Sequence, residues 1–240
     1  MGTIFRRIKG DNMNIIFDVD GTLLDSMHVW LNPMEELFEK YNFKLSDLPK
    51  EKKGELESYS FSDMCHFIAD NLATDMSFDD VIDYLKSNIE DSYKNSLELK
   101  PGIREFLDKL KEENIKMSVA SSTDFKFLEM ALKRLGIFDY FEFFATPDLT
   151  NLTKADKKYW EYSISKHGLE PDQLVLFDDA LYAIKAAKSA GIKTIGVKDF
   201  PHNKGEWDDI VKEADLTLDQ ANLMNIEKIK DSKILKNNIF

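Results

Sequence analysis

The chain has 240 residues, of which 43% are hydrophobic and 32% are charged. This mixture can bury a sizeable core, which argues against a disordered or low-complexity chain, and the length suits one or two domains. Lysine and arginine number 32 against 44 aspartates and glutamates, a formal net charge of −12. This acidic balance disfavours binding to nucleic acid or to anionic membranes, because both rely on basic patches.

Three further observations bear on the cellular location of the protein. Cys65 is the only cysteine, so no disulfide can form within the chain. No apolar run approaches the ~18 residues that a membrane span needs. Residues 1–12 lack the continuous apolar stretch of a secretory signal peptide, and Met13 offers a second possible start. We therefore expect a cytoplasmic protein with an N-terminal extension over 1–12.

In chain order, the first predicted element is the strand Ile15–Phe17, an apolar run that stops abruptly at Asp18. From about residue 28 to residue 97 the apolar residues recur at helical spacing, as at Val81, Leu85 and Ile89, and no strand is predicted. Pro101 ends this segment and is well placed to start a new helix.

Beyond this proline, predicted helices and strands alternate. The strands lie at Met117–Ala120, Phe143–Ala145, Leu174–Phe177 and Thr194–Val197, and the helices at about 103–110, 127–135, 159–167 and 181–190. Such alternation predicts parallel strands with helices on both faces of the sheet. The expected fold class is α/β, a Rossmann-like doubly wound core at 13–27 and 99–227 with a helical domain inserted at 28–98 and a tail at 228–240.

Polar residues follow these strands at their carboxyl ends, where open α/β sheets bind ligands. The candidates are Asp18 and Asp20, Ser121 and Ser122, Asp178 and Asp179, and Lys154 in the connection after the third strand. Because the carboxyl ends of parallel strands meet at one edge, we expect these side chains to share a cleft.

This set of residue types suits phosphoryl transfer. The carboxylate of Asp18 can attack phosphorus directly, and Mg²⁺ held by Asp18 and Asp179 would reduce the repulsion between the two anions. Lys154 adds a fixed positive charge and Ser121 a hydroxyl donor. Asp20 lies two residues further along an extended chain, so it faces the same side and can protonate the leaving oxygen and later activate water.

The same residues carry a resemblance to a known family. The segment Asp18–Thr22, which reads Asp-Val-Asp-Gly-Thr, resembles the first motif of the haloacid dehalogenase superfamily. Ser121 matches the second motif, Lys154 the third and Phe177–Asp179 the fourth. The first motif alone is a weak signal, whereas four motifs in order are a strong one. The resemblance covers nearly the whole chain.

The resemblance implies a role for each residue. Asp18 would be the nucleophile and a magnesium ligand, Asp20 the general acid/base and a ligand through its backbone carbonyl, and Asp179 a further ligand. Ser121, Ser122 and Lys154 would bind the phosphoryl group, and Asp178 would support the metal site without binding the ion. The insert, between the first two motifs, resembles the α-helical cap of the branch that includes sugar-phosphate and phosphoglycolate phosphatases and β-phosphoglucomutase.

The sequence departs from this family pattern at three places. Lys154 is followed by Ala-Asp-Lys where relatives usually read Pro-x-Pro-Asp, which leaves Lys157 or Lys158 as an alternative phosphate partner. Trp30 stands where β-phosphoglucomutases usually have histidine, and Thr22 where they often have valine. The last two differences favour a phosphatase over a mutase, and the second acid, Asp20, argues against dehalogenation.

Two segments of the insert have more than one interpretation. Met27, Trp30, Met34 and Leu37 recur at helical spacing, which predicts core packing rather than a ligand site. The charged run Lys50–Glu55 is predicted to be a solvated loop, with a substrate-facing loop of the cap as the alternative.

The sequence therefore predicts a Mg²⁺-dependent phosphatase of small, sugar-phosphate-like metabolites that works through an aspartyl-phosphate. A phosphomutase and a catalytically silent phosphate-ester-binding module stay open as alternatives. We expect a monomer or weak dimer with no nucleic-acid or membrane partner. The cap should move as a hinge through linkers near 26–29 and 98–102.

Overall fold

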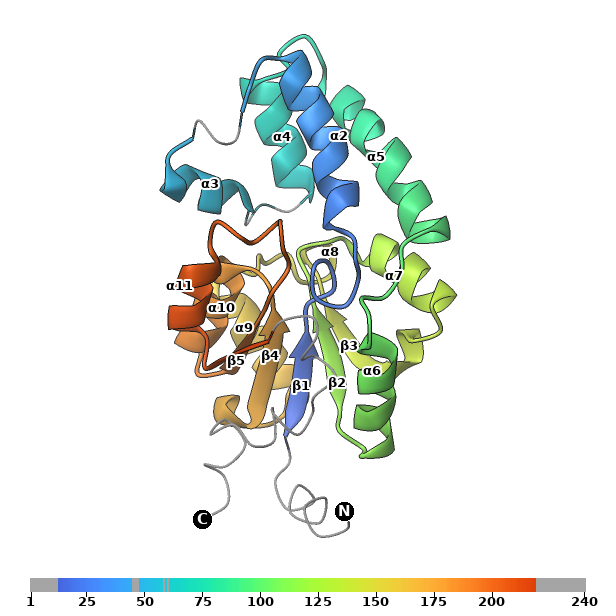
Figure 1. Ribbon diagram of the computed structural model, residues 1–240, viewed down its shortest axis with the longest axis vertical. Coiled ribbons are helices and arrows are strands. Elements are labelled where there is room, and N and C mark those ends of the chain that lie inside the picture. The colour runs from blue at the N-terminus through green and yellow to red at the C-terminus, as the bar shows by residue number, and fades with distance from the viewer. Residues whose placement is uncertain (1–12, 45–47, 58, 60, 219–240) are drawn as a thin grey trace.

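A six-stranded parallel sheet forms the centre of the computed structural model, which describes residues 13–44, 48–57, 59 and 61–218 (Figure 1). The strands are β1 (Asn14–Phe17), β2 (Met117–Ala120), β3 (Phe141–Ala145), β4 (Leu174–Asp178), β5 (Lys193–Val197) and β6 (Leu216–Leu218). Their order across the sheet is β3-β2-β1-β4-β5-β6, and all neighbours are parallel. The predicted α/β fold is therefore confirmed, with β1 buried at its centre.

Helices cover both faces of the sheet because successive residues of β1 point to opposite sides. Ile15 and Phe17 pack with α6 (Ile103–Glu112) and α7 (Phe125–Arg134), whereas Ile16 packs with α9 (Lys157–His167) and α10 (Leu181–Ser189). Shorter helices complete the layers, namely η2 (Phe138–Tyr140), α8 (Pro147–Thr150), η3 (Pro171–Gln173) and α11 (Trp207–Glu213). The central strand is thus sandwiched between two apolar layers, which explains its uninterrupted apolar sequence.

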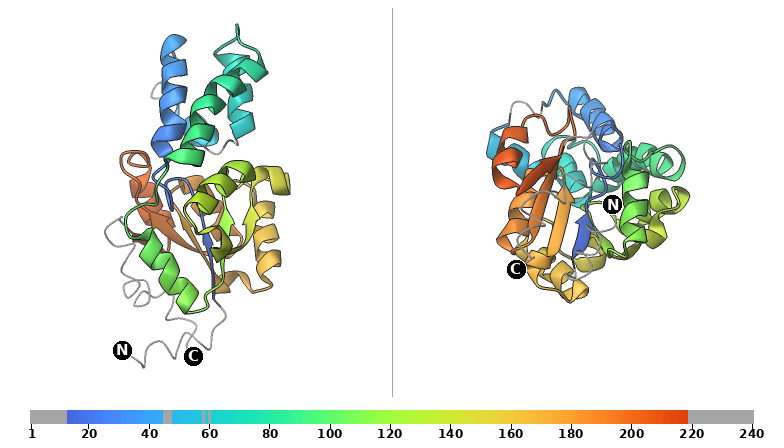
Figure 2. Two further views of the ribbon diagram at one scale, coloured as in Figure 1. Left: turned by 90° about the vertical axis from the view of Figure 1, so that its right-hand side faces the viewer. Right: turned by 60° about the horizontal axis from the view of Figure 1, so that its bottom comes forward.

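Between β1 and α6 the described residues form four helices, which we call the cap. They are α2 (Met27–Lys40), α3 (Lys50–Glu57), α4 (Phe61–Asn71) and α5 (Phe78–Asn95). Figures 1 and 2 show them beyond the carboxyl ends of the strands. The described part of 28–97 holds no strand, as predicted. The assignment of separate domains at 13–27 with 99–227 and at 28–98 stays a prediction.

One expectation for the cap was wrong. The charged run Lys50–Glu55 is not a loop but most of helix α3. Lysine and glutamate are good helix formers, and Lys52 pairs with Glu55 three residues later at 2.9 Å. Leu56 adds a buried contact on the inner side of this helix. Local charge therefore marks the exposed face of a helix here rather than an irregular segment.

The two linkers between the core and the cap lie side by side. Leu24 and Leu99 form an antiparallel bridge, the amide of Asp25 donates to the carbonyl of Glu98 at 3.1 Å, and the amide of Lys100 donates to Leu23 at 2.9 Å. The Lys100 ammonium is itself buried in an ion pair with Asp199, 2.5 Å away. The hinge expected at 26–29 and 98–102 thus has a paired backbone beneath it, and its motion stays a prediction.

The cap also packs against the core through aromatic side chains. The Trp30 ring on α2 and the Tyr93 ring on α5 both contact the Phe127 ring of α7, with centroids 6.2 and 5.6 Å apart. An ion pair between Lys126 of α7 and Glu90 of α5 joins the same helices at 2.9 Å. One apolar cluster therefore runs from the sheet into the cap.

Several details of the fold were not predicted. The short elements α11 and β6 have no strong periodic signal, and β3 begins two residues before the predicted strand at Phe143. Cys65 is a buried free thiol. Among the described helices, none combines the length and the apolar character that crossing a membrane demands. The predicted extension 1–12 and tail 228–240 lie outside the described residues.

His167, at the end of α9, is held between two strands in its neutral form. The Asn14 amide nitrogen of β1 lies 3.0 Å from Nδ1, and the Ser118 hydroxyl of β2 lies 2.9 Å from Nε2. Because an amide nitrogen only donates, Nδ1 accepts and Nε2 carries the proton. Burial lowers the pKa of His167 to about 4, since a charged ring would lose solvation there.

This histidine should make stability sensitive to mild acid. Its folded pKa lies below the ordinary 6.5, so the unfolded chain binds the proton first and the native state loses stability as pH falls from about 6.5 towards 4. We expect His167→Gln to be less stable than wild type at pH 7, with the gap about 1 kcal/mol smaller at pH 5 once partial solvation of the ring is allowed for. Urea unfolding at both pH values measures this, and an unchanged gap would contradict it.

Candidate active site

The first two acids of the site are placed by the end of β1. The amide of Asp18 still bonds the carbonyl of Phe177 on β4 at 2.9 Å, and the chain then turns sharply. Gly21 adopts φ +84°, and a Cβ at this position would lie 2.5 Å from Asp179 Oδ2. Only glycine lets the backbone pass this carboxylate in that conformation. The next residue, Thr22, donates its hydroxyl to Asp179 Oδ1 at 3.2 Å.

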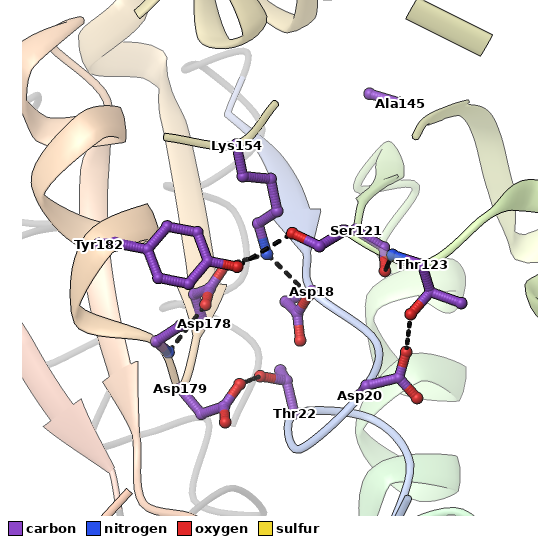
Figure 3. A network of polar contacts seen from close by, with 12 residues as sticks. Asp18, Asp20, Thr22, Ser121, Thr123, Ala145, Lys154, Asp178, Asp179 and Tyr182 are labelled. Atoms are coloured by element: carbon purple, nitrogen blue, oxygen red, sulfur yellow. Dashed lines mark hydrogen bonds and ion pairs between the residues drawn. The ribbon is translucent and has the colours of Figure 1, made fainter. Parts of the chain in front are cut away.

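Lys154 reaches the centre of the site from the loop before α9 (Figure 3). Its Nζ lies 2.7 Å from Asp18 Oδ1 and 2.6 Å from Asp178 Oδ2, and the residue is only 1% exposed. The indole of Trp160 donates to the Lys154 carbonyl at 2.8 Å and fixes the loop. The two alternative lysines, at 157 and 158, are exposed, so the structure brings Lys154 alone of the three to Asp18.

Lys154 contacts two members of a cluster of three buried carboxylates. Asp18, Asp178 and Asp179 each offer an oxygen, and these oxygens lie within 4.8 Å of one another. Burial raises the pKa of Asp18 to about 7 even though Lys154 opposes the shift. Burial also raises the pKa of Asp179, and the negative charges of Asp18 and Asp178 add to this effect. The site therefore holds more negative charge than one lysine neutralises.

This donor set fits a divalent cation. Mg²⁺ prefers oxygen ligands and binds through one or two carboxylates with water and substrate phosphate completing the shell. Asp18 and Asp179 meet this description, whereas Asp178 directs Oδ1 to the amide of Ala180 at 2.9 Å and Oδ2 to Lys154. The raised pKa values of Asp18 and Asp179 reflect uncompensated negative charge in a buried site. A bound cation would compensate that charge and lower both pKa values.

Asp20 lies outside this cluster, beside the cap. Its Oδ2 accepts the Thr123 hydroxyl at 2.7 Å, and its Oδ1 accepts the Ser26 hydroxyl at 2.6 Å. A third hydroxyl, that of Tyr93 on α5, also donates to Oδ1, and the indole of Trp30 donates to Tyr93 at 2.6 Å. A chain of hydrogen bonds thus connects two cap helices to the predicted acid/base carboxylate (Figure 3 shows the Thr123 contact).

The predicted hydroxyl donors lie directly after β2. The Ser121 amide bonds the Ala145 carbonyl of β3 at 3.0 Å, and the Thr123 amide donates to the Ser121 hydroxyl at 3.0 Å. The Ser122 hydroxyl lies 2.9 Å from the Tyr182 hydroxyl of α10. The structure therefore brings all the predicted site residues to one edge of the sheet, although their roles in binding and catalysis stay predictions.

Several contributors were not predicted from the sequence. Tyr93 and Tyr182 approach the site from helices far along the chain. Asn203, in the loop after β5, donates from one amide nitrogen to the carbonyls of Asp179 and Val197, each at 2.9 Å. Their positions depend on tertiary packing, and only Tyr182 carries a local signal, since it stands within the segment after the fourth motif.

A cavity of about 650 Å³ opens above these residues and extends under the cap. Its floor includes Asp18, Asp20, Ser121 and Lys154, and its other wall comes from α2 to α5. Trp30 and Met34, predicted as core, are half-buried and line this wall. The cavity has the size of a small-molecule site. Most of its carboxylates, and the buried Lys154, lie on the core side.

Comparison with known proteins identifies the same family that the sequence motifs resemble. Residues 15–197 match the family described as haloacid dehalogenase-like hydrolase. A phosphorylated carbohydrates phosphatase of Thermotoga maritima is 26% identical over 186 residues, covering 75% of this chain and 82% of that protein. A validoxylamine A 7'-phosphate phosphatase of Streptomyces hygroscopicus subsp. limoneus is 26% identical over 184 residues, covering 76% and 84%.

Solved structures share the fold. A β-phosphoglucomutase of Clostridium difficile superposes with a TM-score of 0.69 at 23% identity, covering 95% of this chain and 98% of that one. At 23% identity this similarity shows a shared fold of core and cap and nothing about the reaction. Because the family match runs from β1 through the cap to the end of β5, and so takes in every strand end that faces the cavity, the chain belongs to the haloacid dehalogenase-like hydrolases.

Proposed function

We propose that this hydrolase is a Mg²⁺-dependent phosphatase of small phosphorylated metabolites that works through an aspartyl-phosphate on Asp18. The observation that carries the proposal is the contact of the buried Asp18 carboxylate with Lys154, 2.7 Å away, at the floor of the cavity between core and cap. The phosphatases among the sequence relatives support the reaction class. The proposal includes a cytoplasmic location and a monomeric or weakly dimeric state.

In the first step, Asp18 attacks phosphorus and the bond between phosphorus and the ester oxygen breaks. Asp20 gives its proton to that oxygen, so the product leaves as a neutral alcohol. Lys154 holds positive charge beside the reacting carboxylate, and Ser121 and Ser122 offer hydroxyls to the phosphoryl oxygens. Asp18 and Asp179 would hold Mg²⁺, which supplies further charge neutralisation when bound.

In the second step, Asp20 takes a proton from water, whose oxygen attacks the phosphorus of the aspartyl-phosphate. The bond to Asp18 breaks, which releases inorganic phosphate and restores the carboxylate. Lys154 is positively charged when the substrate binds. Burial alone would lower its pKa, but Asp178 and Asp18 raise that pKa well above its ordinary value.

The contacts of Trp30 favour hydrolysis over phosphoryl transfer to a second sugar hydroxyl. Its indole nitrogen already donates to Tyr93, and indole has no acid/base function near neutral pH. A mutase would require a bisphosphate activator for turnover, whereas the proposed phosphatase requires none.

Asp18→Asn should abolish phosphate release, because the amide is a far weaker nucleophile. We expect a fall of at least about a thousand-fold in kcat for acetyl phosphate hydrolysis. Asp25→Asn, which removes an exposed carboxylate from the same segment, is the matched control and should keep wild-type activity. Retention of a tenth or more of the activity by Asp18→Asn would exclude Asp18 as the nucleophile.

Mg²⁺ should stabilise the folded protein, because the carboxylates gather only in the native state. At a hundred times its dissociation constant, a ligand adds about 2.7 kcal/mol, which corresponds to a rise of roughly 5–10 °C in melting temperature for a chain of this size. Thermal unfolding with MgCl₂, against KCl of equal ionic strength, measures the effect. Asp179→Asn should lose most of the rise. An unchanged wild-type melting temperature at saturating Mg²⁺ would contradict the site.

Tyr93→Phe tests whether the cap positions the acid/base carboxylate. The change removes one donor to Asp20 and leaves the Trp30 indole without its acceptor, so we expect kcat to fall about tenfold with KM little changed, and stability to fall by about 1–3 kcal/mol. Tyr84→Phe is the control on the same helix, because that hydroxyl is exposed and only approaches Glu36 at 3.4 Å. If both variants had wild-type kcat, Tyr93 would have only a structural role.

A further inference from the structure

The cavity has two chemically different walls. Its core side carries the carboxylates, hydroxyls and lysine described above. Its cap side presents large apolar and aromatic side chains that are neither fully buried nor fully exposed, namely Met27, Trp30, Met34, Tyr59 and Met64. The buried residues Leu85 and Ile89 of α5 back this wall. On this cap side, the part of the substrate that is not phosphate would therefore face mostly carbon and sulfur. On the core side, the half-buried His202 and Glu206 also border the cavity, from the loop after β5.

The polar atoms of this apolar wall already have partners within the protein. The Trp30 indole donates to Tyr93 at 2.6 Å, and the Tyr59 hydroxyl donates to Glu55 at 3.1 Å. Asn32 and Glu35 of α2 also border the cavity, with largely exposed side chains. The wall therefore offers a bound molecule few hydrogen-bonding groups, apart from the half-buried Lys53 of α3.

Such a wall discriminates against a sugar. Each hydroxyl that leaves water without a new partner costs about 1–3 kcal/mol, whereas burial of apolar surface is favourable by about 25 cal/mol per Å². The three methionines are flexible and polarisable, so they adapt to apolar groups of different shape and pack well on rings. The cavity of about 650 Å³ also exceeds what a two- or three-carbon acid would fill.

We propose that the cap wall selects phosphate monoesters with an apolar leaving group, a ring or a branched alkyl chain, in preference to sugar phosphates. This inference rests on the proposed phosphatase function and narrows its substrate class. It departs from the sugar-phosphate-like substrate expected from the sequence, because the cap wall carries few groups that could pair with sugar hydroxyls.

The test compares two esters that differ mainly in their hydroxyl groups. Glucose 6-phosphate and cyclohexylmethyl phosphate both carry the phosphate on a primary carbon attached to a six-membered ring, so their leaving groups are similar in reactivity. We expect kcat/KM to be at least about tenfold higher for cyclohexylmethyl phosphate, the range that differences in apolar contact produce. An equal or higher value for glucose 6-phosphate would overturn the proposal.

Substitutions in the wall identify its contribution. Met34→Gln and Met64→Gln keep the length of the side chain and add an amide, so each should reduce the ratio of the two kcat/KM values about fivefold, mainly through KM for the apolar ester. Met76→Gln is the matched control, because Met76 is a half-buried cap methionine that does not line the cavity. A ratio that is the same in all three variants as in wild type would overturn the assignment to this wall.

Two further measurements separate this inference from the phosphatase proposal. Acetyl phosphate has almost no leaving group to recognise, so its hydrolysis with no preference between the two ring esters would overturn only the substrate class. If the protein hydrolysed none of the three, the phosphatase proposal would fail. The affinities of both ring esters for Asp18→Asn with Mg²⁺, measured by calorimetry, would then test the apolar wall independently of turnover. Tighter binding of cyclohexylmethyl phosphate supports the apolar wall, and tighter binding of glucose 6-phosphate overturns it.

Discussion

The site depends on one buried cation, the ammonium of Lys154. Three carboxylates cannot be withdrawn from water at the end of a parallel sheet unless part of their charge is compensated, because an isolated buried charge costs several kcal/mol. Lys154 forms ion pairs with Asp18 and Asp178. The negative charge of Asp179, the third carboxylate of the cluster, needs a further source of positive charge. The same crowding of carboxylates suits the site to hold a divalent cation. In the proposed mechanism that cation would in turn help to bind a phosphate ester.

Much of this arrangement could be predicted from the sequence because it follows from strand topology. Asp18, Ser121 and Asp178 each come directly after an apolar strand, and the carboxyl ends of neighbouring parallel strands meet at one edge. The alternation of predicted strands and helices had already indicated an α/β fold. The choice of Lys154 over its two neighbours could be made from family position alone, and the burial of its side chain against Asp18 explains that choice physically.

The remainder could not be predicted because it arises from packing between distant segments. Tyr93 reaches Asp20 only after α5 has packed on α7, and Asn203 holds the Asp179 carbonyl from a loop that has no periodic pattern. Helical spacing predicted correctly that Trp30 and Met34 share an inner face of α2. It could not show that this face is divided between packing on Phe127 and the wall of a cavity, since both environments require the same apolar residues.

The cap therefore has two functions that the structure joins in one set of side chains. Trp30 lines the apolar wall and, by donating to Tyr93, also completes the hydrogen-bond chain that ends on Asp20. A leaving group that packs on the Trp30 ring would contact the first member of the hydrogen-bond series from Trp30 through Tyr93 to Asp20. Asp20 is the residue expected to protonate that leaving group. Contacts made through Trp30 should for this reason affect kcat as well as KM, unlike those made by the methionines of the wall, because only Trp30 also belongs to the chain that sets the geometry of proton transfer.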